Sequence, residues 1–240
     1  MVNLKEEKDK TKENRKFDTF ELNQLKYEEA TKQDKRSFIQ TYCDILCREH
    51  KIIFTFLICN DYNLIYIKIA RFIFLIATDI AMNVFFFSDD SMHKIFLNYG
   101  KYNFIQQIPQ ILYSTIISQL LEVFICYLSL TDKHIYEIKN LTCSNKKLEI
   151  VNILKCIKLK LIYFFCFTFI FLGFYWYIVS AFCAVYQKTQ IIFLNDSLFS
   201  FLSSLLYPFV LYLFPSALRK LSFKFRIKYM YILSFIIPFF

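Results

Sequence analysis

The segment Leu161–Val185, LIYFFCFTFIFLGFYWYIVSAFCAV, has 25 residues and contains no Asp, Glu, Lys, Arg or His. An α-helix needs about 20 predominantly apolar residues to cross the hydrocarbon core of a bilayer. A helix that is apolar on every side belongs in lipid or deep inside a large protein. A soluble domain of 240 residues does not need such a helix over this length. The segment therefore predicts a membrane-spanning helix.

Three further apolar stretches extend this prediction to a bundle, and the hydrophobic content of 56% fits several spans. Pro208 and Pro215 should kink or end the last stretch, because proline removes a helical hydrogen bond. We expect an all-α fold, an integral membrane helical bundle with flanking interfacial amphipathic helices. Its transmembrane helices, about four, are predicted at roughly residues 64–87, 108–130, 161–185 and 197–218.

The segments outside this four-span bundle (64–218) differ in character. Residues 1–36 are charged and poor in apolar side chains, which predicts a cytoplasmic tail that is largely disordered and becomes weakly helical at residues 21–36. Residues 37–63 place Phe38, Tyr42 and Ile45 at helical spacing among charged residues, which favours an amphipathic helix at the membrane interface. Residues 219–240 alternate basic and apolar side chains before an apolar end, and predict a tail docked on the membrane.

The basic residues indicate an orientation. Residues 131–160 hold 7 Lys or Arg against 3 Asp or Glu, and residues 215–228 hold 5 basic residues and no acidic one. Cytoplasmic loops carry the excess of Lys and Arg, so both termini are predicted to be cytoplasmic. The same segments are expected to meet an anionic leaflet of the lipid bilayer, and this surplus beside spans does not indicate a nucleic-acid partner. The sequon at Asn140 should then stay unmodified.

Ionisable residues inside the expected spans are the main candidates for a functional site. Such residues usually pair with one another, face the bundle interior or mark a pathway. Asp79 and Asn83 are four residues apart on one helical face of the first span, and Glu122 lies inside the second. From a rise of about 1.5 Å per residue, Arg71 or Lys68 can reach Glu122, and Asn83 is the expected partner of Asp79. Both a structural ion pair and an ion or proton pathway remain open.

The last span offers a candidate face for helix packing. Ser197, Ser200 and Ser204 fall on one side, and Ser200 with Ser204 has the spacing of small residues that lets helices approach closely. Other membrane proteins or further copies of the chain are the partners that such a face would serve.

The sequence does not point to catalysis or to a cofactor. Its only glycines, Gly100 and Gly173, form no phosphate-binding loop, and its three histidines are isolated from one another. Cys43, Cys47 and His50 share a helical face, but zinc needs a fourth ligand and no second pair has the spacing of a zinc site. We expect a protein that is not an enzyme and that binds no metal.

Several strings resemble a known group of proteins: LKYEEATKQDKRSF, IIFTFLICNDYN, SMHKIFLNYGKYNFIQQIPQILYSTIIS and FYWYIVSAFCAVYQKTQIIFLNDSLFSFLSSLLYPF. They look like the membrane-spanning C-terminal module of large uncharacterised multi-span transmembrane proteins of protists. The resemblance covers most of residues 22–215 and implies a shared multi-span bundle with no established activity.

Two hypotheses for the function follow. The first is a non-enzymatic membrane anchor or accessory subunit that uses the basic segments and the serine face. The alternative is an oligomeric ion channel or transporter built around Asp79 and Glu122, because four spans seldom enclose a path alone.

Overall fold

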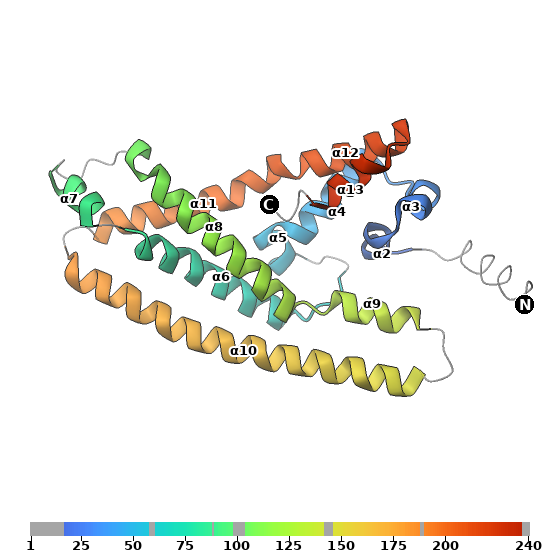
Figure 1. Cartoon of the computed structure of the whole chain (residues 1–240), viewed down its shortest axis with the longest axis horizontal. Helices are drawn as coiled ribbons and strands as arrows, with labels where there is room; N and C mark the ends of the chain where they lie inside the picture. The colour runs from blue at the N-terminus through green and yellow to red at the C-terminus, as the bar shows by residue number, and fades with distance from the viewer. Residues whose placement is uncertain are drawn as a thin grey trace, which may run out of the picture.

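The computed structural model describes residues 17–57, 61–87, 89–97, 104–141, 146–187 and 190–236. Within these residues every regular element is an α-helix (Figure 1), and the prediction of an all-α bundle is confirmed. The helices are α2 (Thr19–Gln24), α3 (Tyr27–Gln33), α4 (Phe38–Glu49), α5 (Lys51–Phe56), α6 (Ile65–Phe85), α7 (Asp89–Leu97), α8 (Phe104–Ser129), α9 (Asp132–Asn140), α10 (Lys146–Val185), α11 (Gln190–Leu211), α12 (Leu213–Phe225) and α13 (Lys228–Ile236).

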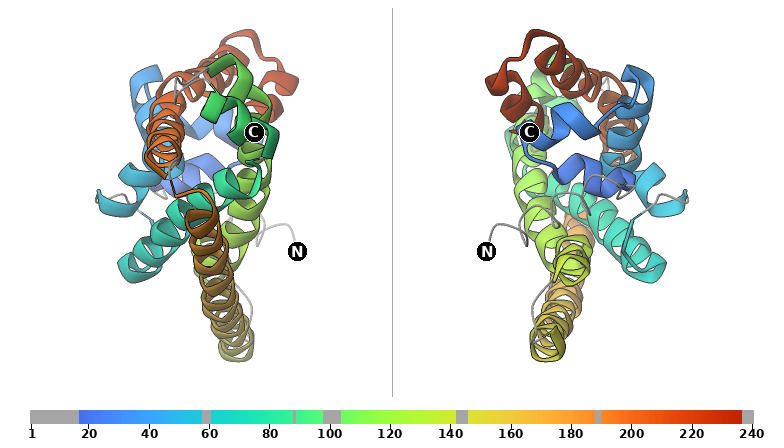
Figure 2. Two further views of the ribbon diagram at one scale, coloured as in Figure 1. Left: turned by 90° about the vertical axis from the view of Figure 1, so that its left-hand side faces the viewer. Right: turned by 90° about the vertical axis from the view of Figure 1, so that its right-hand side faces the viewer.

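The long helices run alternately from one end of the molecule to the other (Figure 1). Helices α6 and α10 run from the end that carries α2 and α3 toward the end that carries α7, and α8 and α11 run back. Helix α6 is central, since it packs against α8, α10 and α11. End views place α10 at one edge of the molecule and α12 with α13 at the opposite edge (Figure 2).

Among the described residues, three helical segments are long and apolar enough to cross a membrane: Ile108–Lys139, Lys147–Val185 and Phe193–Phe225. They contain the second, third and fourth predicted spans. Helix α6 matches the first predicted span in position but carries Lys68, Arg71 and Asp79, and it is not among the three. Length and composition therefore support a membrane protein.

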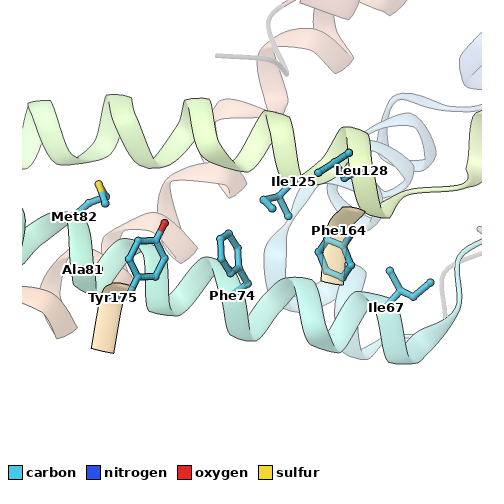
Figure 3. Packing of buried hydrophobic residues seen from close by; sticks show 8 residues of the cluster. All are labelled: Ile67, Phe74, Ala81, Met82, Ile125, Leu128, Phe164 and Tyr175. Carbon is cyan, nitrogen blue, oxygen red and sulfur yellow. The ribbon is translucent and has the colours of Figure 1, made fainter. Parts of the chain in front are cut away.

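The core lies where α6, α8 and α10 meet (Figure 3). Phe74 of α6, Ile125 of α8 and Phe164 of α10 are fully buried there, and Tyr175 of α10 packs beside Phe74. The Tyr175 hydroxyl lies 3.3 Å from Thr78 Oγ1, so the one polar group of this ring has a partner inside the bundle. A smaller cluster holds the α7 end together, from Val84, Met92, Phe182 and Phe193.

Most of the surface of the long helices is apolar. On α10, Phe169 is 81% and Trp176 is 78% exposed, as expected of side chains that face lipid. The predicted effect of proline is also visible in the last long helix. Pro208 lies inside α11 without ending it, whereas α11 ends at Leu211, four residues before Pro215, and α12 begins at Leu213.

Residues 17–36 are more ordered than the expected weakly helical tail, whereas residues 1–16 lie outside the described residues. Helix α2 begins at a capping box between Asp18 and Glu21, and α3 follows it directly. Leu25 and Ala30 are buried against Tyr231 of α13. Composition underestimates the order of this segment, because a few apolar residues are enough to hold it in place when a distant part of the chain covers them.

The two other flanking segments also differ from expectation. Residues 37–63 form two helices, α4 and α5, which separate at His50, and α5 packs against α6. Residues 219–225 continue α12 and do not start a separate tail. The chain then turns at Arg226, which has a left-handed φ of 57°, and α13 packs back on α12. Residues 58–60 and 237–240 lie outside the described residues.

Candidate functional site

Four charged side chains form what we call the central ion-pair network: Lys51, Arg71, Asp79 and Glu122. Lys51 Nζ lies 3.4 Å from Asp79 Oδ2 and 3.3 Å from Glu122 Oε2. Arg71 Nη2 lies 3.5 Å from Glu122 Oε1. Two cations thus face two anions, and Lys51 stands between both carboxylates. An ion pair away from water persists only when each charge is compensated, and this arrangement compensates all four.

Helix α5 delivers Lys51 to this network. Its N-terminus is capped by the side chain of His50, whose Nδ1 accepts a hydrogen bond from the Ile53 amide at 3.3 Å. His50 Nε2 lies 2.9 Å from the carbonyl oxygen of Leu205 in α11, a distance that suits an Nε2–H donor. His50 is buried, and the centre of its ring lies 4.8 Å from that of Phe209, with the two planes tilted by 57°. The imidazole therefore fixes where α5 begins, and with it the position of Lys51.

One of the two ion pairs expected for Glu122 is present in the structure. The Glu122–Arg71 pair is present, and the alternative pair with Lys68 is not. Lys68 Nζ binds the Asp61 carboxylate and donates to the carbonyl oxygen of Phe54 at 3.1 Å. The turn before α6 brings Asp61 to Lys68, so this cation is satisfied without Glu122.

The partner expected for Asp79 was Asn83, and this expectation is wrong, because Lys51 occupies that role. Asn83 instead faces α8. Its Oδ1 accepts from Ser114 Oγ at 3.0 Å, and its carbonyl oxygen accepts from Gln110 Nε2 at 3.3 Å.

Sequence reasoning missed a polar face on α8. Gln110, Ser114, Ser118 and Glu122 follow one another at four-residue spacing, and the first three are buried. The face covers about 18 Å of helix at about 1.5 Å per residue. Among the residues that the structure describes, Gln110 Oε1 has no hydrogen-bond partner. The regular spacing was the signal in the sequence that could have found this face.

The serine face of α11 divides into two parts. Ser197 is buried and its Oγ has no partner within the described part of the chain. Ser204 is half-buried and donates to the carbonyl oxygen of Phe201 in its own helix at 2.8 Å. Ser200 is also half-buried. Helix α11 packs against α6, so small side chains on α11 suit a close helix contact.

A second polar cluster joins the two ends of the described chain. We call α2 and α3 together with α12 and α13 the terminal cap. Arg36 makes a two-pronged contact with Asp34, with both nitrogen–oxygen distances at 2.8 Å. Arg219 Nε of α12 lies 3.1 Å from Asp34 Oδ2, and its Nη2 donates to the carbonyl oxygen of Leu22 at 2.7 Å.

The environment of Asp34 favours its charged form. Burial by itself raises the pKa of this carboxyl, but the hydrogen bond and charge of Arg36 and the charge of Arg219 outweigh it. The pKa of Asp34 therefore lies below its ordinary value, and the ionised carboxylate contributes to the stability of the terminal cap.

Helix α9 is tied to the same end of the molecule. Lys139 Nζ lies 2.9 Å from Glu21 Oε1 and 3.1 Å from Asp18 Oδ2 of the α2 capping box. Tyr62, which leads into α6, donates its hydroxyl to Asp18. Segments from before α6, from between α8 and α10, and from after α11 thus gather at one end.

The described residues contain no group of three or more His, Cys, Asp or Glu side chains that could hold a metal ion. Cys43 and Cys47 have free thiols, and His50, their neighbour on the expected face, serves as a helix cap. The chemistry that the described polar groups can perform is ion pairing and hydrogen bonding within the bundle. Comparison of the chain with protein-family models, with curated proteins and with solved structures finds no match.

Proposed function

We propose that the chain is a multi-pass integral membrane protein in which α6, α8, α10 and α11 cross the bilayer. Contacts between α2 and α9 support α6 as a span. Because Lys139 touches Glu21, the chain between them must cross an even number of times. Among the described residues of that interval, α6 and α8 are the long helices, and most of α8 belongs to a segment that has the length and composition of a span. At 21 residues, α6 is about 31 Å long, which suffices for a bilayer.

The same parity holds for the second half. Arg219 touches Asp34 and Lys139 touches Glu21, so α10 and α11 lie between two segments on one side. The basic surplus of residues 131–160 and 215–228 falls on that side, which makes it cytoplasmic by the positive-inside rule.

Labelling with a membrane-impermeant maleimide tests this topology. In a variant without native cysteines, Lys32→Cys and Lys224→Cys should react only after intact cells are permeabilised. Gln187→Cys, at the opposite end, should react without permeabilisation, since all three positions are exposed but lie on different sides. Labelling of Lys32→Cys and Lys224→Cys from opposite sides, or a glycan on Asn140, would contradict the four-span arrangement.

We further propose that the protein is a non-enzymatic membrane anchor or accessory subunit. The observation that carries this proposal is the placement of Lys51 between Asp79 and Glu122, with Arg71 completing the balance of charge. A network whose charges cancel one another suits a structural brace that joins α5 to α6 and α8. The terminal cap, the basic segments and the apolar flank of α10 are the surfaces available to a partner.

Purification from native membranes in mild detergent tests the anchor hypothesis. We expect a stoichiometric, larger protein to co-purify, and a liposome assay should then detect no ion flux through the isolated chain. Mass spectrometry identifies the partner, and a crosslinker applied before solubilisation guards against its loss. A regular homo-oligomer that conducts ions and loses conduction in Asp79→Asn would contradict the anchor and favour the alternative.

The polar face of α8 favours that alternative, an oligomeric channel or transporter. Gln110, Ser114, Ser118 and Glu122 form a continuous polar stripe along one helix, and the unsatisfied Gln110 Oε1 would suit a water molecule. We place this second because Lys51 neutralises the stripe at its charged end, where a permeant cation would have to bind.

A further inference from the structure

A shallow groove of about 540 Å³, wide open to the surroundings, runs along one face of α10 across the start of its uncharged segment. The residues that line it all belong to α10, and they are apolar except for Lys158: Leu154, Ile157, Lys158, Leu161, Ile162, Phe165 and Cys166. Ile162 and Phe165 follow Lys158 along the same face of α10, and both side chains are about half exposed. The groove therefore has one charged end and an apolar length.

Positive charge collects at that end. Lys155 lies one turn before Lys158, both are exposed, and within the described residues no carboxylate forms an ion pair with either. Lys160 lies on the other side of α10, where its Nζ is 3.3 Å from His134 Nε2 and 4.5 Å from the centre of the Tyr127 ring, so Lys155 and Lys158 supply the charge at the groove. Lys155 and Lys158 are therefore available to bind an anion.

The groove also lies at a defined depth. Lys160 is the last charged residue before the 25 uncharged residues 161–185. If α10 is inserted as proposed above, Lys158 is level with the lipid headgroups, and Phe165 is about 10 Å deeper at about 1.5 Å per residue. A phospholipid has the same pattern, with an anionic phosphate above an apolar chain.

We propose that the α10 groove binds an anionic phospholipid, and this inference rests on the proposed membrane insertion of α10. Its phosphate contacts Lys158 and Lys155, and one acyl chain lies along Ile162 and Phe165. Charge selects the occupant, because a zwitterionic lipid carries no net charge for these lysines to attract. A second copy of the chain would bring its own lysines to the same place and repel.

A tryptophan placed in the groove can report the bound lipid. Trp176 is the only tryptophan of the chain, so the variant Trp176→Phe has no tryptophan fluorescence of its own. Phe165→Trp in this background puts the reporter in the groove. Tyr163→Trp is the matched control, at nearly the same depth and 58% exposed but outside the groove. The full chain is reconstituted in phosphatidylcholine bilayers, and brominated lipids quench the fluorescence on contact.

Brominated phosphatidylserine should quench the tryptophan at position 165 at lower mole fraction than brominated phosphatidylcholine does. The expected preference is about fivefold for each lysine contact. Lys155→Gln with Lys158→Gln should abolish the preference, whereas Lys224→Gln with Arg226→Gln, which removes equal charge from α12, should retain it. The control tryptophan at position 163 should be quenched equally by both lipids.

Each other outcome has a separate meaning. Equal quenching by the two lipids at position 165 overturns the groove as an anionic-lipid site and leaves membrane insertion intact. Shielding of position 165 from both lipids, with position 163 quenched, means that protein covers the groove and also overturns the proposal. Absence of quenching at position 163 contradicts the insertion of α10 itself.

Discussion

Lys51→Met is expected to lower the free energy of unfolding by about 3 kcal/mol, the lower end of the range for breaking a buried ion pair. The substitution keeps a linear apolar side chain but removes the ammonium group that lies 3.4 Å from Asp79 and 3.3 Å from Glu122. Glu122 then keeps Arg71 as its partner, whereas Asp79 loses its ion-pair partner and its negative charge remains uncompensated inside the bundle. Thermal unfolding in detergent, followed by helical circular dichroism, measures the loss.

A second substitution tests whether the loss is electrostatic. Adding Asp79→Asn to Lys51→Met restores the balance, because Arg71 and Glu122 remain paired. The double variant should therefore recover most of the stability, which a lost packing contact of Lys51 would not allow. Lys32→Met, at an exposed position in α3, should change stability by less than about 0.5 kcal/mol. A Lys51→Met protein as stable as the wild type would refute the network as a structural brace.

Arg219→Met is expected to detach residues 17–36 from α12, at a cost of about 3 kcal/mol, because it removes the contacts of Arg219 with Asp34 and with Leu22 of α2. Arg219 is buried, binds Asp34 and the carbonyl oxygen of Leu22, and lies over the ring of Tyr231 at 5.2 Å. Methionine fills part of the volume but leaves Asp34 with Arg36 alone. Limited proteolysis of the full chain should then cut residues 17–36 much faster, while the long helices stay protected.

Two comparisons make this prediction specific. Lys224→Met, on the exposed side of the same helix, should leave the rate of cleavage unchanged. The effect of Arg219→Met should also depend on pH. The folded pKa of Asp34 is depressed, so its ion pairs contribute fully above the unfolded pKa of about 3.9 and are lost as pH falls through the lower folded value. Variant and wild type should therefore converge only below about pH 3.9, as pH falls through the folded pKa of Asp34, and a difference that persists below that folded pKa would exclude Asp34 as the partner.

Local patterns in the chain predict the parts of the structure that depend on neighbours in sequence. The uncharged run 161–185 requires an apolar environment wherever it lies, and it forms the second half of α10. Glu122 and Arg71 could be matched because depth in a helix is counted along the chain, and their helices run antiparallel. The break before Pro215 follows from a clash within one helix. Each of these results needs only helical geometry and hydrophobicity.

Tertiary structure alone decided the rest. Lys51 reaches Asp79, 28 positions away, only because His50 caps α5 against α11 and turns it toward α6. Residues 17–36 are ordered by Arg219, which is 185 positions from Asp34. Composition cannot anticipate such order, since a charged segment folds when distant partners compensate its charges and cover its few apolar residues. The sequence by itself therefore determined which segments are apolar helices, whereas long-range ion pairs decided how the flanking helices close on them.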